Sequence, residues 1–439
     1  MRRVLVLLVA FLALAAPAAA GTLFVIDGRG WGHGIGMSQY GAKGYAENGW
    51  SHGRILAHYY RGTELRTVPP RQVRVLLAEL QGRVRISSSK PFRAVDRRGT
   101  VRRLPAGPYV LAPGAQKAKR LKGLKLPLRF EPGAAPLRLG ENAYRGALLV
   151  HGDRGKLTVV NRLPLDRYLR GVVPWEMPDD WHPEALRAQA VVARSYALAT
   201  LKPTALFDLY SDVRSQVYGG IRAEATSTNL AVGATAGKVL MWNGRIATTF
   251  YHSTSGGKTA PIADVWPRAN PLPYLVSVPD PYDRASKHHT WGPFRFTPAE
   301  VAKALGAGLV RDLIVDRKPS GRVSHVGITT RAGRKTVLAQ DFRAQLGLRS
   351  TWFTVRVLRL DPHLRRAIAA QPITLTGFVR GLTDVRLEQQ VNGGAWTTVR
   401  PLKPRPDGRF ATTVKPRRTT SYRLAAPQAA GAAITLKVR

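Results

Sequence analysis

The chain has 439 residues, with 68 Lys and Arg against 27 Asp and Glu, a net charge of +41. A hydrophobic content of 44% excludes wholesale disorder, and the length predicts two or three domains. The absence of Cys excludes disulfides, thiol catalysis and every Cys-based metal site. The basic excess indicates an anionic partner: nucleic acid, a membrane surface or an acidic polymer of the cell envelope.

The first 20 residues have the pattern of a secretory signal peptide. Arg2 and Arg3 precede an apolar run over 4–16, and small residues follow at 18–20. The run is short for a bilayer span, so cleavage near Gly21 is favoured over an uncleaved anchor. We therefore expect an exported protein, extracellular or associated with the cell wall, with no transmembrane segment after cleavage. Since nucleic acid is no routine partner there, no nucleic-acid role is expected.

Further along the chain, the patterns predict an α+β fold. In chain order the expected elements are a β stretch over 22–27, a glycine-dense loop over 28–42, a helix near 51–60, mostly β structure over 72–160, and the strongest helix within 174–201.

From residue 373 the chain changes to short alternating segments separated by turn residues. This pattern is typical of a small immunoglobulin-like β-sandwich. The predicted organisation is a mostly β domain with a few helices over 21–360, a linker over 361–371 and an all-β domain over 372–439.

The loop over 28–42 contains six glycines. Glycine permits positive φ and close approach of the backbone to a ligand or another strand. Trp31 and Tyr40 are suited to stacking on sugar faces, and His33 to hydrogen bonding near neutral pH. The alternative is a tight turn that holds core aromatic residues. A nucleotide-binding loop is rejected, because an exported protein has little use for nucleotide.

The predicted helix from Pro183 is apolar on most faces, so it should be largely buried. Arg194 lies on it and needs a carboxylate or a ligand anion. A structural ion pair is the alternative to a functional role.

Upstream of that helix, Glu176 stands between Trp175 and Met177, with Pro174 and Pro178 outside them. The prolines are expected to disfavour helix here. Apolar neighbours should raise the pKa of the carboxyl group, which suits a general acid. A surface glutamate between two turns is the alternative.

Two polar, glycine-bearing stretches follow, at 211–220 and 250–259. Their Ser, Thr and Asp side chains often make only local backbone hydrogen bonds. The spacing of His33, Asp212 and His252 matches no ligand motif, so no metal and no cofactor are expected.

These blocks resemble the sporulation stage II protein D family, also called SpoIID/LytB-like or amidase-enhancer domains. The resemblance spans roughly residues 28–355 and rests on GWGHGIGMSQYGA (30–42), YLRGVVPWEMP (168–178) with AQAVVARSYAL (188–198), SDVRSQVYGG (211–220), YHSTSGGKTAPIADVW (251–266) and FRAQLGLRS (342–350).

The order of the blocks departs from the usual family arrangement, in which the GWGHG block comes last. Here it comes first, which resembles a circular permutation. A permutation implies that the stretch 22–27 pairs beside the segment near 351–356. Some members hold zinc through cysteines, and this chain has none.

The resemblance implies a peptidoglycan lytic transglycosylase acting on glycan strands, with Glu176 as the single acid and base. The mostly β domain over 21–360 would then be the catalytic domain, with its few helices around a glycan groove. Arg194 would orient Glu176 or hold a sugar carboxylate. The implied substrate-binding residues are Trp31, His33, Gln39, Tyr40, Asp212, Gln216, Tyr218, Ser253, Thr254 and Ser255. The alternative functions are a non-catalytic glycan-binding module that stimulates an amidase, and a basic binder of anionic wall polymers.

Overall fold

The computed structural model describes residues 21–113, 119–202, 206–361 and 366–439. The predicted signal peptide over 1–20 lies outside them. The fold is mixed α+β, with strands in several sheets, which confirms the predicted class. None of the helices in the described ranges is long and apolar enough to cross a membrane.

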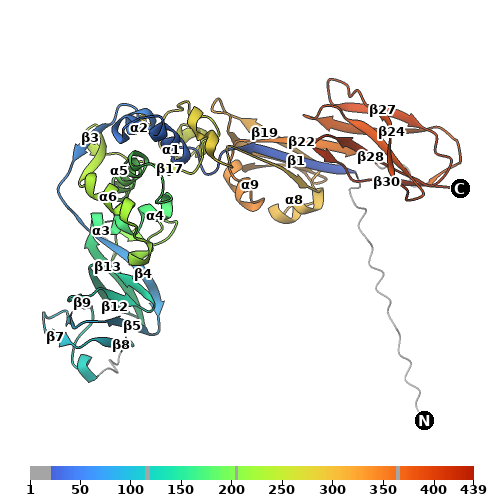
Figure 1. Ribbon diagram of the computed structural model, residues 1–439. Coiled ribbons are helices and arrows are strands. Elements are labelled where there is room, and N and C mark those ends of the chain that lie inside the picture. Colours follow the sequence, from blue (N-terminus) through green and yellow to red (C-terminus); the bar gives the residue numbers. More distant parts are fainter. Residues whose placement is uncertain (1–20, 114–118, 203–205, 362–365) are drawn as a thin grey trace, which may run out of the picture. The chain divides into compact units, whose positions relative to one another are not determined.

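The described residues form two compact units, one of residues 30–289 and one of residues 21–29 with the described part of 290–439 (Figure 1). The division differs from the predicted single domain over 21–360. The strands at the two ends of that predicted domain, β1 (Thr22–Arg29) and β22 (Phe353–Leu360), belong with the C-terminal segment. They lie in one sheet of the order β18 (Thr290–Phe296), β1, β22, β24 (Ile373–Arg380) and β27 (Arg409–Val414). The predicted boundaries of the β tail stay a prediction.

The unit 30–289 has a β-rich part and a helical part with separate apolar cores. The β-rich part is built mainly on β4 (Gln72–Gln81), β5 (Val84–Ser88), β6 (Phe92–Val95), β7 (Val101–Leu104), β8 (Gly107–Leu111), β9 (Leu128–Glu131), β10 (Leu137–Leu139), β11 (Asn142–Tyr144), β12 (Ala147–Asp153) and β13 (Lys156–Pro164). This confirms the mostly β prediction for 72–160.

The helical part surrounds α5 (Pro183–Ala199), the predicted strong helix (Figure 1). Its other elements are β2 (Met37–Ser38), α1 (Gln39–Glu47), α2 (His52–Tyr59), β3 (Glu64–Thr67), α3 (Leu165–Arg170), α4 (Val173–Glu176), α6 (Thr226–Ala234), β15 (Lys238–Trp242), β16 (Arg245–Ile246), β17 (Tyr251–His252), α7 (Ile262–Val265) and the 3-10 turn η3 (Pro281–Ala285). The short strand β14 (Leu209–Tyr210) pairs with β4 in the sheet of the β-rich part.

Two local expectations were wrong. The backbone at Glu176 is helical, because Pro174 occupies the first turn of α4, where its missing N–H costs nothing. The glycine-dense segment is loop only over 30–36. Met37 and Ser38 form β2, and the Ser38 side chain accepts from the N–H of Gly41 and begins α1.

The other unit contains β1 (Thr22–Arg29), which pairs antiparallel with β22 (Phe353–Leu360) and with β18 (Thr290–Phe296). The pairing of β1 with β22 confirms the expected neighbourhood of 22–27 and 351–356. The remaining elements are α8 (Pro298–Leu305), β19 (Asp312–Arg317), β20 (Val323–Thr330), β21 (Gly333–Leu338) and α9 (Ala339–Gln345).

The described segment over 372–439 contains strands and no helix, as the alternating pattern predicts, and one more strand, β23 (Arg366–Ala367), lies within the predicted linker over 361–371. The strands of the segment are β24 (Ile373–Arg380), β25 (Arg386–Val391), β26 (Trp396–Pro401), β27 (Arg409–Val414), β28 (Thr420–Ala426), β29 (Ala429–Ala430) and β30 (Ile434–Val438). They lie in two sheets whose apolar faces share a core with β1 and β22.

Arg194 is a structural cation in the centre of the helical part. It is 1% exposed, and its Nε donates to Asp166 at 2.9 Å. Its remaining N–H groups donate to Thr235 and to the main-chain carbonyls of Ala190, Val232 and Lys238. Burial lowers the pKa of the guanidinium, and the Asp166 carboxylate opposes that shift. Arg194 therefore holds α5 to α3, α6 and β15.

Replacing Asp166 with Ala should lower the free energy of unfolding by about 2 kcal/mol, because it leaves a buried guanidinium without its counter-charge. The loss is smaller than for a fully buried pair, since the Asp166 side chain is 40% exposed. Chemical denaturation measures it. The control is Glu47→Ala, which breaks the exposed pair with Lys43 and should cost less than about 0.5 kcal/mol. Equal losses would contradict the structural role of Arg194.

Candidate active site

Glu176 is the last residue of α4, and its carboxyl group is partly buried. The hydroxyl of Tyr251 donates to Glu176 Oε1 at 2.9 Å, and the side chain of Gln39 forms a second hydrogen bond with the carboxyl group. Burial raises the pKa of Glu176, while the hydrogen bonds from Tyr251 and Gln39 act in the opposite direction. Burial has the larger effect, so the carboxyl group keeps its proton to a higher pH than an exposed glutamate.

Behind Tyr251 lies a short chain of hydrogen bonds that sets its orientation. Gln216 Nε2 donates to the Tyr251 hydroxyl at 3.0 Å, and Tyr168 donates to Gln216 Oε1 at 3.4 Å. Burial keeps the pKa of Tyr251 well above its usual value, and the Glu176 charge adds to that shift. Because Tyr251 accepts from Gln216 and keeps its own proton, its O–H points at Glu176.

The backbone that brings these groups together is a parallel pairing of two very short strands. Tyr251 and His252 of β17 pair with Met37 and Ser38 of β2, so Gln39 directly follows the pairing. Gly36 precedes it with φ 67°, and a Cβ there would lie 2.0 Å from the carbonyl oxygen of Phe250. A side chain at Gly36 would force the strands apart. The sequence-based expectation of close backbone approach is confirmed here.

Two residues predicted to bind substrate support Glu176 instead. Gln39 bonds the carboxyl group, and Gln216, only 2% exposed, contacts Tyr251 and has no surface to offer a glycan. Tyr168 and Tyr251 were not predicted, although both lie in blocks that drew attention to their neighbours. Tyr251 directly precedes His252 in its block, and Tyr168 begins the block of Glu176. The available signal was that both tyrosines lie in the same short sequence blocks as residues that were predicted for the site.

Several aromatic side chains of the same unit remain open to solvent. Trp175, next to Glu176, is 54% exposed, and Trp31 is 42% exposed with its ring edge-on to His288. Tyr40 packs edge-on against Trp181, with ring centroids 4.8 Å apart. The His33 ring is less available, since it lies 5.2 Å from Trp266 and 5.5 Å from His252, and its Nδ1 accepts from the N–H of Ile35.

Other predictions for the site need correction. Arg194 pairs with Asp166 as described above and makes no hydrogen bond to Glu176 among the described residues. Tyr218 is 6% exposed and donates to Asn161 Oδ1 at 2.9 Å, so it belongs to the core. Thr254 and Ser255 are fully buried, with hydroxyls bonded to Ser286 and Asp283. These hydroxyls cannot contact a glycan in this conformation.

The remaining two predicted residues lie nearer the surface. Asp212 forms an exposed ion pair with Arg214 at 2.7 Å, and hydrogen bonds from Arg214 lower the pKa of its carboxyl group. Ser253 is partly exposed, with its hydroxyl 3.2 Å from that of Thr254 and its carbonyl bonded to the N–H of Tyr40. Both stay predictions as substrate contacts.

Comparison with known proteins places part of this unit in a family. The family model described as stage II sporulation protein, SpoIID, matches residues 153–242, which include Glu176, Arg194 and Gln216. The chain contains a SpoIID-family domain.

Relatives of known name support the assignment. The chain is 30% identical over 211 residues to the stage II sporulation protein D of Bacillus subtilis strain 168, covering 44% of this chain and 61% of the relative. It is 29% identical over 240 residues to the protein of the same name from Bacillus amyloliquefaciens, covering 51% of this chain and 66% of the relative.

A third relative has a different name. The amidase enhancer of Bacillus subtilis is 41% identical over 119 residues, which are 26% of this chain and 15% of that protein. The SpoIID-like chain therefore spans less than two thirds of the length of these relatives. No solved structure gives a significant match.

The SpoIID-like chain also holds a buried acid pair that the sequence patterns did not suggest. Asp280 and Asp283 are both fully buried. Asp280 Oδ1 accepts from Tyr59 at 2.8 Å, and Asp283 accepts from Ser255, from the N–H of Gly256 and from His289. Asp280, directly before η3, also forms a side-chain hydrogen bond with Ser38, which begins α1. This contact ties η3 to the helix whose first residue is Gln39.

Burial and the neighbouring Asp283 raise the pKa of Asp280 to about 7. The folded protein therefore binds a proton that the unfolded chain releases near pH 4, so this residue's contribution to stability falls as pH rises from about 4 to 7. The slope is at most about 1.4 kcal/mol per pH unit.

Asp280→Asn should remove that part of the pH dependence, because a neutral amide imitates the protonated acid. Unfolding free energies from pH 4 to 8 measure it, as the difference between variant and wild type. At pH 8 the variant should be the more stable protein. Asp180→Asn, at an exposed position, is the control and should leave the slope unchanged. Parallel curves for Asp280→Asn and wild type would contradict the raised pKa.

Proposed function

We propose that this chain is an exported peptidoglycan lytic transglycosylase that cleaves the muramoyl–glucosaminyl bond of glycan strands. One observation carries the proposal: a single partly buried glutamate, Glu176, with a raised pKa and two hydrogen-bonding partners, lies beside an exposed tryptophan. The SpoIID and amidase-enhancer relatives support a role at the cell wall.

A single carboxyl group is enough for this reaction, because no water is consumed. Protonated Glu176 gives its proton to the glycosidic oxygen as the bond to the muramoyl anomeric carbon breaks. The primary hydroxyl of the same muramoyl residue then forms a bond to that carbon, and its proton returns to the Glu176 carboxylate. The product is an anhydromuramoyl end, and the enzyme is regenerated in its starting protonation state.

The surroundings of Glu176 suit both halves of this cycle. Burial favours the protonated form that begins the reaction, and the donors Tyr251 and Gln39 stabilise the carboxylate that follows the first step. Most glycoside hydrolases use a second carboxyl group about 5–10 Å from the acid. The two side chains that hydrogen-bond to Glu176, Tyr251 and Gln39, are neutral, and the proposed reaction needs no second carboxyl group because the muramoyl hydroxyl is the nucleophile.

The net charge of +41 has a place in the same proposal. Phosphate-bearing wall polymers are anionic, and a strongly basic chain is attracted to them over a range set by ionic strength. We propose these polymers as secondary partners that retain the protein at the wall.

The second candidate function is a non-catalytic module that binds wall glycan and stimulates an amidase. The observation in its favour is the match to the amidase enhancer. Exposed Trp31 and Trp175 serve a binding module as well as an enzyme.

Glu176→Gln separates the two functions. On purified glycan strands without stem peptides, wild type should release anhydromuramoyl ends, and the variant should be slower by a factor of about 100 to 10,000. Mass spectrometry of the products measures it. The control is Glu141→Gln, whose side chain is 97% exposed. If Glu176→Gln released anhydromuramoyl ends as fast as Glu141→Gln, Glu176 would not be the acid. If wild type released none, the amidase-stimulating module would be favoured.

Tyr251→Phe should move the alkaline limb of the pH profile of kcat/KM to higher pH. The lost hydrogen bond stabilises the carboxylate, so its removal raises the pKa of Glu176 and keeps the acid protonated further up the scale. The rate below that limb should fall, because the same bond stabilises the carboxylate formed in the first step. A limb that stays in place, or moves to lower pH, would contradict the role of Tyr251.

A further inference from the structure

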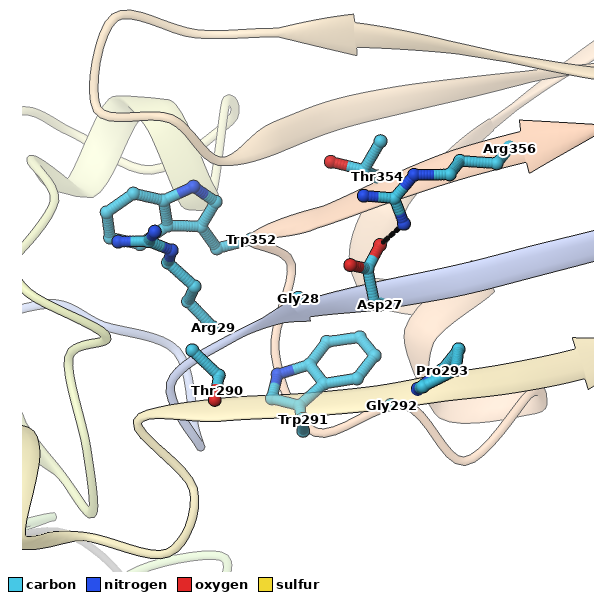
Figure 2. Close-up of a pocket in the computed structure, with 10 residues that line it drawn as sticks. All are labelled: Asp27, Gly28, Arg29, Thr290, Trp291, Gly292, Pro293, Trp352, Thr354 and Arg356. Atoms are coloured by element: carbon cyan, nitrogen blue, oxygen red, sulfur yellow. Dashed lines mark hydrogen bonds and ion pairs between the residues drawn. The ribbon is translucent and has the colours of Figure 1, made fainter. Parts of the chain in front are cut away.

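The unit that lacks Glu176 contains a cavity of its own, at the end of the sheet formed by β18, β1 and β22 (Figure 2). Its volume is about 460 Å³, within the range of small-molecule sites. The lining residues are Asp27, Gly28, Arg29, Thr290, Trp291, Gly292, Pro293, Trp352, Thr354 and Arg356.

The charges that line this cavity do not cancel. Arg356 forms an ion pair with Asp27, which uses the single carboxylate of the lining. Arg29 is exposed, and its guanidinium lies 5.8 Å from the ring centre of Trp352, with no ion pair to a carboxylate in the described part of the chain. Two guanidinium groups and one carboxylate leave a net charge of +1, at Arg29.

Aromatic and polar groups accompany that charge. Figure 2 shows Arg29 beside Trp352, with the ion pair of Asp27 and Arg356 further along the sheet and Trp291 below β1. Trp291 is 6% exposed, and its indole N–H has no acceptor among the described residues. Buried donors without an acceptor are uncommon. The hydroxyls of Thr290 and Thr354 also line the cavity.

We propose that this cavity binds a sugar that carries a carboxylate. A planar guanidinium free of other carboxylates recognises a carboxylate with two parallel hydrogen bonds. The partly exposed indole of Trp352 packs against the apolar C–H groups of a pyranose ring, and the hydroxyls of Thr290 and Thr354 bind its hydroxyl groups. The size of the cavity suits one or two sugar units.

Among wall sugars, the muramoyl residue combines a pyranose ring with a lactyl carboxylate, and this choice rests on the proposed function. The cavity lacks an acid with the surroundings of Glu176, because its one carboxylate is neutralised by Arg356. The site therefore holds a glycan without cleaving it.

The test measures binding of N-acetylmuramic acid by isothermal titration calorimetry to the whole chain and to Arg29→Gln. The monosaccharide has no glycosidic bond to cleave, so the readout is independent of the activity assigned to Glu176. Loss of the charged hydrogen bonds should weaken binding about tenfold. Arg331→Gln is the matched control, because Arg331 is exposed on the turn between β20 and β21 in the same unit and does not line the cavity.

Two further ligands test the chemistry of recognition. N-acetylglucosamine, which lacks the carboxylate, and lactate, which lacks the ring, should each bind more weakly than N-acetylmuramic acid. Unchanged affinity in Arg29→Gln would overturn the proposal. So would equal binding of lactate, which would indicate a simple anion site, or equal binding of N-acetylglucosamine, which would indicate a neutral sugar site. A cleavage assay that failed for Glu176 would leave all these results valid.

Discussion

The candidate active site depends on the parallel pairing of β2 with β17, two residues against two. A pairing of two residues contributes few hydrogen bonds. It forms only where the two backbones can approach closely. Gly36 makes this possible, because it has a left-handed φ and no side chain against the carbonyl of Phe250. Once the pairing forms, Gln39 and Tyr251 are carried to the same carboxyl group.

The buried acids Asp280 and Asp283 are a second constraint on the position of β2 and α1. Asp280 ties η3 to Ser38 at the beginning of α1, and Tyr59 of α2 donates to Asp280. Buried acids are costly, and this cost is reduced by hydrogen bonds and by the proton that Asp280 keeps up to about pH 7. The position of Gln39 therefore depends on the protonation state of Asp280, a buried residue that hydrogen-bonds to Ser38 directly before it.

Some of the arginines form structural ion pairs inside the fold, and others remain free to bind an anionic ligand. Arg194 is surrounded by Asp166 and main-chain carbonyls, and these hydrogen bonds join α5 to the elements packed around it. Arg29 lies at an open cavity with an aromatic neighbour and no carboxylate partner in the described ranges. Net charge alone does not distinguish such residues, because the difference lies in what surrounds each guanidinium.

The sequence by itself determined the α+β class, the strong helix from Pro183, the β-rich segment and the alternating strands of the tail. These features follow from local periodicity and turn residues, which act within a few positions. Glu176 was proposed as the acid because its sequence block resembles a family, and its local pattern alone also fitted a surface glutamate. Only the tertiary structure decided that Arg194 meets Asp166, that Tyr218, Thr254 and Ser255 are buried, and that Tyr251 contacts Glu176. Those contacts join residues 28 to 75 positions apart, and their geometry depends on how whole elements pack.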